Sequence, residues 1–248
     1  MGEFELSLYE NASELARGAA ERFVEWVSAR LAETPGALPA ALPVALSGGR
    51  IAGAFFREVT LAAKERKLSF DCLEFFFADE RWVPLTEPES NFHLAQTHLF
   101  EPMRVPPANL HPIYGATTPE DAAQRAEASL RLLLPSKPSR VPSIPLIILG
   151  MGEDGHIASL FPGGPQEPPG TARVYAPVMG PKPPSLRVSL THPAIAAAGE
   201  VWVLVSGAGK EHALGESLEP RGKTPLAQVI ASRRKTAVLT EIRLPGWP

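Results

Sequence analysis

Short apolar runs alternate with longer amphipathic segments along most of this chain. The short runs are nearly all apolar rather than alternating, which is typical of strands that are buried on both faces of a sheet. We expect strands at 44–47, 73–78, 146–149, 174–178, 187–191, 201–206 and 236–240, with a further short strand at 109–113.

The segments between these runs have the spacing of apolar residues that amphipathic helices require. In the first of them, Leu15, Phe23 and Val27 fall on one face, and Asn11 stands at a capping position. Helices are expected at 11–33, 50–67, 90–100, 119–134, 208–218 and 225–231. Helices that alternate with buried strands predict a three-layer α/β fold, with a mostly parallel sheet flanked by helices. Because no repeat or linker divides the chain, we expect residues 1–248 to form a single α/β domain.

The composition limits which binding partners and which cellular location we expect for this protein. The 248 residues carry a formal net charge of −3 and a pI near 6.1, so no broad basic surface is available for nucleic acid. The single cysteine, Cys72, excludes an intrachain disulfide. The first residues include Glu3 and Glu5 and do not resemble a signal peptide, and no run approaches the ~20 apolar residues of a membrane span. We expect a cytoplasmic protein that is a monomer or a weak homodimer.

The stretch 145–162 carries the most distinctive chemistry in the sequence. The expected strand 146–149 is followed by Asp154 and His156, set among three glycines. Glycine lets the backbone turn sharply and approach a ligand closely. A histidine that follows a buried strand and stands two residues after an aspartate is placed for proton transfer at the carboxyl edge of a sheet.

Two other interpretations of this stretch remain open. Gly150-x-Gly152-x-x-Gly155 matches the dinucleotide-binding fingerprint, but Pro162 leaves little room for the long helix that the fingerprint opens. No second strand ends in an acidic residue about 20 residues later, where a ribose would be held. The other alternative is a surface turn with a solvated histidine, and the combination of strand, glycines, Asp and His argues against it.

Three more loops follow expected strands and carry polar side chains. The glycine turn 47–50 leads into a helix and suits a phosphate, because backbone N–H groups and the helix dipole both attract anions. A second glycine turn, 206–210, ends in a lysine, and Asp79 in the charged cluster 79–81 could orient a sugar hydroxyl or assist proton transfer. Each loop alone is also typical of an ordinary turn. Together they predict a phosphate site. The candidate residues for binding the phosphate or the rest of the substrate are Ser47, Gly48, Gly49, Arg50, Arg81, Asn91, Gly152, Arg187 and Lys210.

The sequence lacks the motifs of several other classes of enzyme and of metal sites. The chain has no Gly-x-Ser-x-Gly elbow of an α/β-hydrolase and no P-loop. His93 and His98 are five residues apart rather than four, and no acidic or cysteine cluster supports them, so no metal site is expected. Cys72 lies beside a hydrophobic strand, which is more typical of packing than of a nucleophile.

In this order the motifs resemble the family that contains 6-phosphogluconolactonases and glucosamine-6-phosphate deaminases. The resemblance runs from about residue 11 to 239, and its most specific part is Gly-x-Gly-x-Asp-Gly-His-x-Ala-Ser-Leu-Phe-Pro at 150–162. The other motifs are Ala45-Leu-Ser-Gly-Gly49, Ala78-Asp-Glu-Arg-Trp-Val-Pro84 with Ser90-Asn91, Arg187-Val-Ser-Leu-Thr191 and Gly207-Ala-Gly-Lys210.

The resemblance implies a Rossmann-like fold, no organic cofactor and no required metal. It implies hydrolysis of 6-phospho-D-glucono-1,5-lactone to 6-phosphogluconate in the oxidative pentose phosphate pathway. By position, His156 would be the general base, and Asp79 and Asp154 would support the polar network. The residues implied as phosphate ligands are the Ser47 turn, Arg81, Arg187 and Lys210.

The chain also departs from the family pattern. Arg50 stands where the family commonly has Ser or Thr, and Ser189 where a threonine is usual. Phe161 occupies the place of a glutamate that deaminases of this family use in proton transfer, which favours the lactonase. A deaminase/isomerase is the first alternative. A non-catalytic sugar-phosphate-binding protein is the second, because binding alone needs the same histidine and cations.

Overall fold

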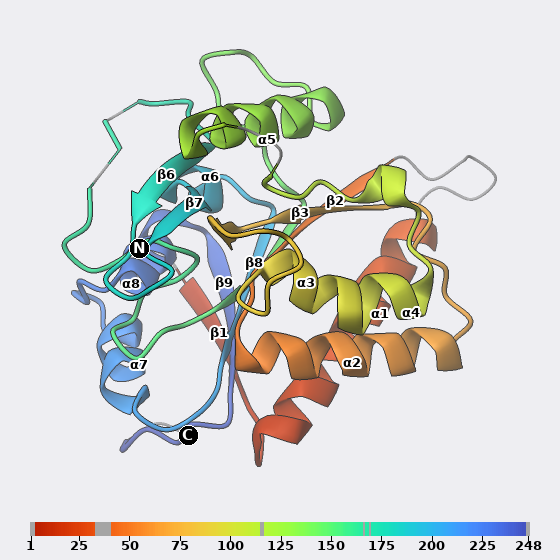
Figure 1. The fold of residues 1–248 in the computed structure, drawn as a ribbon. Coiled ribbons are helices and arrows are strands. Elements are labelled where there is room, and N and C mark those ends of the chain that lie inside the picture. Colours follow the sequence, from red (N-terminus) through yellow and green to blue (C-terminus); the bar gives the residue numbers. More distant parts are fainter. Residues whose placement is uncertain (1–2, 33–40, 115–116, 166, 169, 247–248) are drawn as a thin grey trace.

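A six-stranded parallel sheet forms the centre of the computed structural model, which describes residues 3–32, 41–114, 117–165, 167–168 and 170–246 (Figure 1). The strands lie in the order β1-β9-β8-β5-β2-β3. Their bounds are β1 Glu3–Leu8, β2 Leu42–Leu46, β3 Leu73–Phe77, β5 Leu146–Gly150, β8 Glu200–Val205 and β9 Lys235–Thr240. The continuous apolar runs are buried, as their pattern predicted, and the expected α/β fold with a mostly parallel sheet is confirmed.

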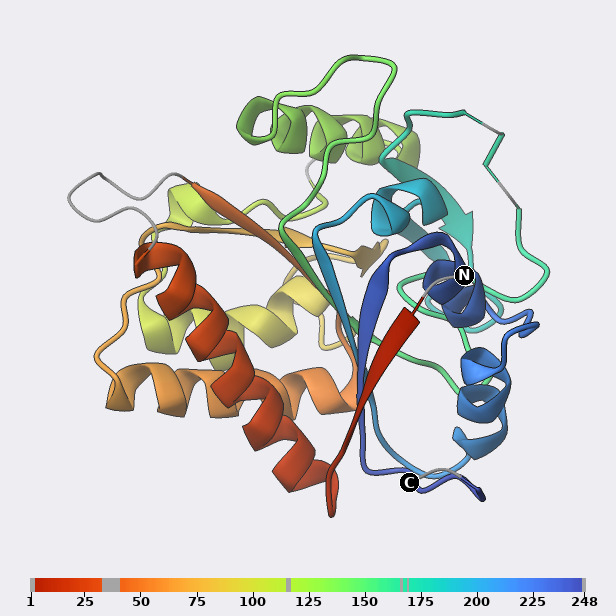
Figure 2. The same ribbon diagram turned by 180° about the vertical axis from the view of Figure 1, so that it is seen from behind.

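Helices cover both sides of this sheet (Figures 1 and 2). On one side, α1 (Ala12–Ala32) and α2 (Arg50–Glu65) pack against each other, with α3 (Asn91–Ala95), a π-helical turn (Gln96–Phe100) and α4 (Glu101–Met103) beside α2. On the other side lie α5 (Pro119–Leu133), α6 (His192–Ala196), α7 (Glu211–Leu218) and α8 (Pro225–Ser232). Among the described helices, none has the length and apolar character needed to cross a bilayer.

A second, antiparallel sheet branches from the first at Ala78. It has the order β4-β7-β6, with bounds β4 Asp79–Arg81, β7 Leu186–Leu190 and β6 Tyr175–Met179. The N–H of Ala78 donates to the carbonyl of Leu46 at 2.7 Å, and the carbonyl of Ala78 accepts from the N–H of Leu190 at 2.7 Å. Ala78 therefore joins both sheets, and the charged residues that follow it lie at the carboxyl edge of the main sheet.

The structure differs from three of the expected strand assignments. The N-terminal segment was not expected to be a strand, but it forms β1, an edge strand paired with β9. The charged cluster 79–81 is strand β4 rather than a loop, because β7 pairs with it. At 109–113 the expected strand is wrong: a 3-10 turn at Pro107–Asn109 is followed by a single bridge from Leu110 to Phe75, since consecutive prolines before it remove backbone donors.

Three further segments, two strands and one helix, have the predicted type of structure. The strands at 174–178 and 187–191 pair with each other in the second sheet and not in the main one. The helix expected at 208–218 begins only at Glu211, because Gly207 and Gly209 adopt φ values of 97° and 86°, which no helix allows. A helix at 192–196 was not expected; Thr191 caps it by accepting from the N–H of Ala194.

The order of the strands reverses between β5 and β2. From β2 the chain continues to β3 on one side, and from β5 it continues to β8 and β9 on the other side. In open α/β sheets such a reversal leaves a crevice outside the carboxyl ends of the two strands. The turn that begins at Ser47 follows β2, and the loop that carries His156 follows β5.

Candidate active site

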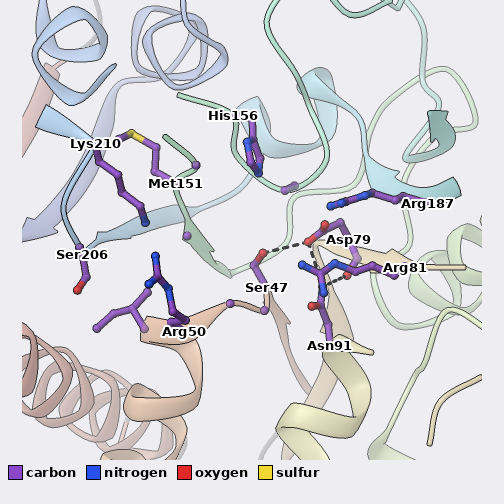
Figure 3. Close-up of a pocket in the computed structure, with 17 residues that line it drawn as sticks. Ser47, Arg50, Asp79, Arg81, Asn91, Met151, His156, Arg187, Ser206 and Lys210 are labelled. Carbon is purple, nitrogen blue, oxygen red and sulfur yellow. Dashed lines mark hydrogen bonds between the residues drawn. The ribbon is translucent and has the colours of Figure 1, made fainter. Parts of the chain in front are cut away.

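A cavity of about 260 Å³ lies at this crevice and is reached by all four of the predicted post-strand loops (Figure 3). Of the predicted catalytic and binding residues, all but Asp154 line it: Ser47, Gly48, Gly49, Arg50, Asp79, Arg81, Asn91, Gly152, His156, Arg187 and Lys210. Asp154 contacts His156 instead. The predicted residues therefore come together in space, while the roles given to them remain predictions.

The imidazole of His156 is held by the carboxylate of Asp154. Nδ1 of His156 lies 2.5 Å from Oδ1 of Asp154, and the backbone N–H of His156 donates to the same oxygen at 3.2 Å. Burial raises the pKa of Asp154, but the hydrogen bond and charge of His156 outweigh it and hold the pKa below its ordinary value. An ionised Asp154 favours the tautomer with the proton on Nδ1, which leaves the lone pair of Nε2 to accept a proton.

Gly152 leaves room for that imidazole. Its N–H donates to the carbonyl of His156 at 2.8 Å, which closes the loop on itself. A Cβ at this position would lie 2.1 Å from Nδ1 and from Cε1 of His156. Gly152 was predicted to bind the substrate; it lines the cavity, and the structure also gives it this steric role.

Asp79 is a buried carboxylate, and the three side chains that donate hydrogen bonds to it are uncharged. It is 3% exposed; Oδ1 accepts from the Ser47 hydroxyl at 3.0 Å and from Nδ2 of Asn91 at 3.3 Å, and Oδ2 accepts from the Ser159 hydroxyl at 2.7 Å. Each of these donors comes from a different part of the chain, so Asp79 ties the turn after β2, the start of α3 and the loop after β5 together.

Glu80 and Ser159 are two residues of this network that the sequence analysis missed. Glu80 is 2% exposed, and its carboxylate accepts from the N–H groups of Arg81, Asn91 and Phe92, each at 2.8 Å, and from the Ser90 hydroxyl at 3.0 Å. Burial raises the pKa of Glu80, and these four hydrogen bonds counteract it in part. Glu80 thus caps α3 and positions Asn91. The sequence analysis gave roles to Asp79 and Arg81 in this cluster but none to Glu80, because its partners at the start of α3 lie about ten residues further along the chain.

Arg50 and Lys210 face each other at one end of the cavity (Figure 3). Burial lowers the pKa of Lys210, and the charge of Arg50 lowers it further, against the opposite effect of Glu241 and Glu153. Arg50 is the first residue of α2, and Lys210 is the residue before α7. Two helix N-termini and two cations therefore converge at this end, an arrangement that favours a dianion.

Arg81 and Arg187 lie at the other end, with His156 and Ser47 between the two pairs (Figure 3). They are directly opposite each other in the β4–β7 ladder, where like charges destabilise a sheet. Burial lowers the pKa of Arg187, and the charge of Arg81 adds to this effect. In the described part of the chain neither pair of cations forms an ion pair with a carboxylate, so both ends of the cavity can attract an anion.

Phe161 lies between His156 and Arg187. Its ring centroid is 4.8 Å from that of His156, and the guanidinium carbon of Arg187 is 5.5 Å from the ring. The position at which related deaminases were expected to carry a carboxylate therefore presents an apolar face to His156. Among the described residues no three His, Cys, Asp or Glu side chains converge as metal ligands, and the expected lack of a metal or organic cofactor remains a prediction.

The fold and the cavity define an α/β protein built to bind a small anionic molecule beside an oriented histidine. The chain belongs to the family of glucosamine-6-phosphate isomerases and 6-phosphogluconolactonases, whose model matches residues 10–239. The predicted family is thereby confirmed.

Individual relatives agree with this assignment. The chain is 34% identical to a 6-phosphogluconolactonase of Streptomyces coelicolor over 190 residues, which cover 73% of this chain and 71% of that protein. A solved 6-phosphogluconolactonase from Trypanosoma cruzi superposes with a TM-score of 0.78 and 25% identity, covering 97% of this chain and 96% of that one. A monomeric glucosamine-6-phosphate deaminase shares the fold, with a TM-score of 0.76, 17% identity and 96% of each chain covered.

The steric role of Gly152 can be tested directly. We expect Gly152→Ala to push the imidazole away from Asp154, because a Cβ would meet the movable end of the His156 side chain and not the backbone. The Nδ1 proton resonance of His156 in NMR spectra should then be lost, while the free energy of unfolding changes by less than about 1 kcal/mol. Gly215→Ala in α7 is the matched control; nothing lies within 4 Å of its added Cβ, and it should leave that resonance unchanged. A retained resonance in Gly152→Ala would contradict the steric role.

Glu80 should contribute to stability directly, and to turnover only through the position of Asn91. Glu80→Gln replaces one acceptor oxygen by an NH₂ group that faces backbone donors, so we expect a loss of about 1–3 kcal/mol in the free energy of unfolding. Urea denaturation measures this change. Because Asn91 loses its anchor, the loss should be accompanied by slower turnover; unchanged stability would show that the carboxylate does not cap α3.

Proposed function

We propose that this chain hydrolyses 6-phospho-D-glucono-1,5-lactone to 6-phospho-D-gluconate in the oxidative pentose phosphate pathway, with His156 as the general base. The observation that carries this proposal is that one cavity holds the imidazole that Asp154 orients through Nδ1 together with four cations that form no ion pair with a carboxylate among the described residues. The relatives named 6-phosphogluconolactonase support the choice of substrate.

A lactone is an activated ester, so this reaction needs no covalent nucleophile. In the proposed mechanism Nε2 of His156 takes a proton from water while the water oxygen attacks C1. The carbonyl oxygen becomes negatively charged, and the intermediate collapses as the bond from C1 to the ring oxygen breaks. The imidazolium returns its proton to the ring oxygen, and the new carboxylic acid loses its proton to solvent. General base catalysis of this kind contributes typically ~10²–10⁴-fold.

The phosphate supplies binding energy far from the bond that breaks. We assign it to Arg50, Lys210 and the backbone of the turn 47–50, because two helix N-termini and two cations meet there. Holding the phosphate fixes C1 relative to His156, so remote binding energy lowers the entropic cost of the reaction. Ser47 and Asn91, both anchored on Asp79, are assigned to the sugar hydroxyls between the two ends.

A deaminase/isomerase is the alternative within the family. That chemistry moves protons between carbon and oxygen and relies on a carboxylate close to the histidine. Here the ring of Phe161 lies against His156 instead, which is the observation that favours the lactonase. A binding protein without activity would use the same cations, and only an assay separates it from the enzyme.

The proposal treats residues 1–248 as one catalytic domain that works as a monomer or a weak homodimer without a cofactor. It also assigns a cytoplasmic location, since the lone Cys72 gives no disulfide and the substrate is an intermediate of central metabolism.

The decisive assay follows the opening of freshly generated 6-phosphogluconolactone. Production of 6-phosphogluconate is coupled to its dehydrogenase and corrected for spontaneous hydrolysis, and the same protein is tested for ammonia release from glucosamine 6-phosphate. We expect fast lactone opening and no ammonia. Ammonia release without lactone opening would establish the deaminase, and tight phosphosugar binding without either reaction would establish the binding protein.

His156 should affect turnover far more than affinity. His156→Asn keeps a polar side chain of similar position but removes the base, so kcat should fall by about 10²–10⁴-fold with a much smaller change in KM. Steady-state kinetics measures both values. An unchanged kcat in this variant would show that His156 is not the general base.

A further inference from the structure

Lys210 is carried by a turn and not by a regular strand or helix. The turn 206–210 connects β8 to α7, and Lys210 at its end points toward Arg50 (Figure 3). Gly207 and Gly209 within the turn have φ values of 97° and 86°, in the region that favours glycine. Because glycines restrict the backbone so little, the position of Lys210 depends on contacts that hold the turn from outside.

Glu241 makes such a contact. Its Oε1 accepts from the Ser206 hydroxyl and from the N–H of Gly207, each at 2.9 Å. Val205 and Thr240 are partners in the parallel β8–β9 ladder, so Ser206 and Glu241 are the residues that directly follow two neighbouring strands. This register brings the carboxylate of Glu241 to the turn from another element. The sequence analysis gave no role to Glu241, since its partners lie more than thirty residues away.

The second oxygen of this carboxylate shows that holding the turn does not explain the charge. Oε2 of Glu241 is buried and has no hydrogen-bond partner among the described residues. Burying an unpaired carboxylate oxygen is unfavourable, and most buried polar atoms are paired. Both bonds to the turn use Oε1, and the neutral amide of a glutamine would offer an equivalent acceptor. The negative charge therefore calls for a separate explanation.

Lys210 provides that explanation. Burial lowers the pKa of Lys210, the charge of Arg50 lowers it further, and the charges of Glu241 and then Glu153 oppose both effects. Neither carboxylate forms an ion pair with Lys210 in the described part of the chain, so the ammonium group stays available for an anion. Glu241 thus favours the charged lysine from a distance and does not compete for it.

We propose that Glu241 is a positioning residue for the phosphate: its carboxylate fixes the turn 206–210 and thereby places the ammonium group of Lys210 opposite Arg50. Glu241 touches no substrate itself and acts through Lys210. The inference rests on the proposed function only through the assignment of the phosphate to this end of the cavity.

A double-mutant cycle tests whether Glu241 acts through Lys210. Binding of 6-phosphogluconate to the full chain is measured by titration calorimetry near neutral pH. Glu241→Ala removes both the acceptor and the charge, so we expect binding about tenfold weaker or more. In the Lys210→Met background the same change should weaken binding by less than about twofold, because no lysine is left to position. Equal weakening in the two backgrounds would overturn the proposal.

Glu241→Gln separates the acceptor from the charge. It keeps an oxygen for the turn, so near neutral pH we expect an affinity within about threefold of the unmodified chain. Without the opposing charge the pKa of Lys210 falls further, and binding should be lost at a lower alkaline pH. Glu153→Gln is the matched control; it removes the same charge without a bond to the turn, and its shift should be smaller. Binding as weak as in Glu241→Ala, or an unshifted alkaline limb, would count against the proposal.

Thermal melts check that each variant folds. If Glu241→Ala does not fold, Ser206→Ala, which removes one of the two bonds, must show a smaller loss with the same dependence on Lys210, or the proposal fails. The affinities need no turnover, so a chain that shows this coupling yet opens no lactone would refute the proposed function and leave Glu241 in its role. Unchanged affinity in Lys210→Met would overturn the phosphate assignment and this inference, while the lactonase activity could still stand.

Discussion

Ala78 lies between β3 and β4 and links the two sheets through its backbone hydrogen bonds, and the geometry of the candidate site depends on that residue. Its N–H pairs with β2 in the parallel sheet, and its carbonyl pairs with β7 in the antiparallel one. The three residues that follow are thereby held as a strand, in which side chains alternate between faces. Asp79 and Arg81 point into the cavity, and Glu80, between them, points to the start of α3. The pairing of β4 with β7 also sets Arg187 opposite Arg81.

The three acidic residues of the site face different electrostatic conditions and serve different purposes. Asp154 is the most exposed and orients an imidazole through a short hydrogen bond. Asp79 is buried among neutral donors and joins separate loops, while Glu80 is buried at a helix start and accepts mainly from backbone N–H groups. None of them neutralises the cations that line the cavity. A protein with a formal net charge of −3 can therefore present a strongly positive pocket, because the field in a partly buried cavity is set by its own lining.

The fold does not choose between the two chemistries of this family, since a deaminase has the same fold at much lower sequence identity. The choice depends on individual side chains next to the histidine. Phe161 gives His156 an apolar neighbour and at the same time contacts the guanidinium of Arg187. Arg50 places a second positive charge beside Lys210, and this charge adds to the effect of burial in lowering the pKa of Lys210.

The sequence by itself determined the alternation of buried strands and helices, and with it the parallel sheet, because continuous apolar runs can be buried only when both faces of a sheet are covered. It also determined which loops carry chemistry, since Asp154, His156 and the two glycine turns follow such strands directly. Only the tertiary structure decided that 79–81 is a strand, that Glu80 caps a helix and that Arg187 opposes Arg81. The strand at 79–81 and the Arg81–Arg187 pair depend on residues about a hundred positions apart, and local composition carries no record of that pairing. The separation of the four cations into two ends of one cavity has the same origin.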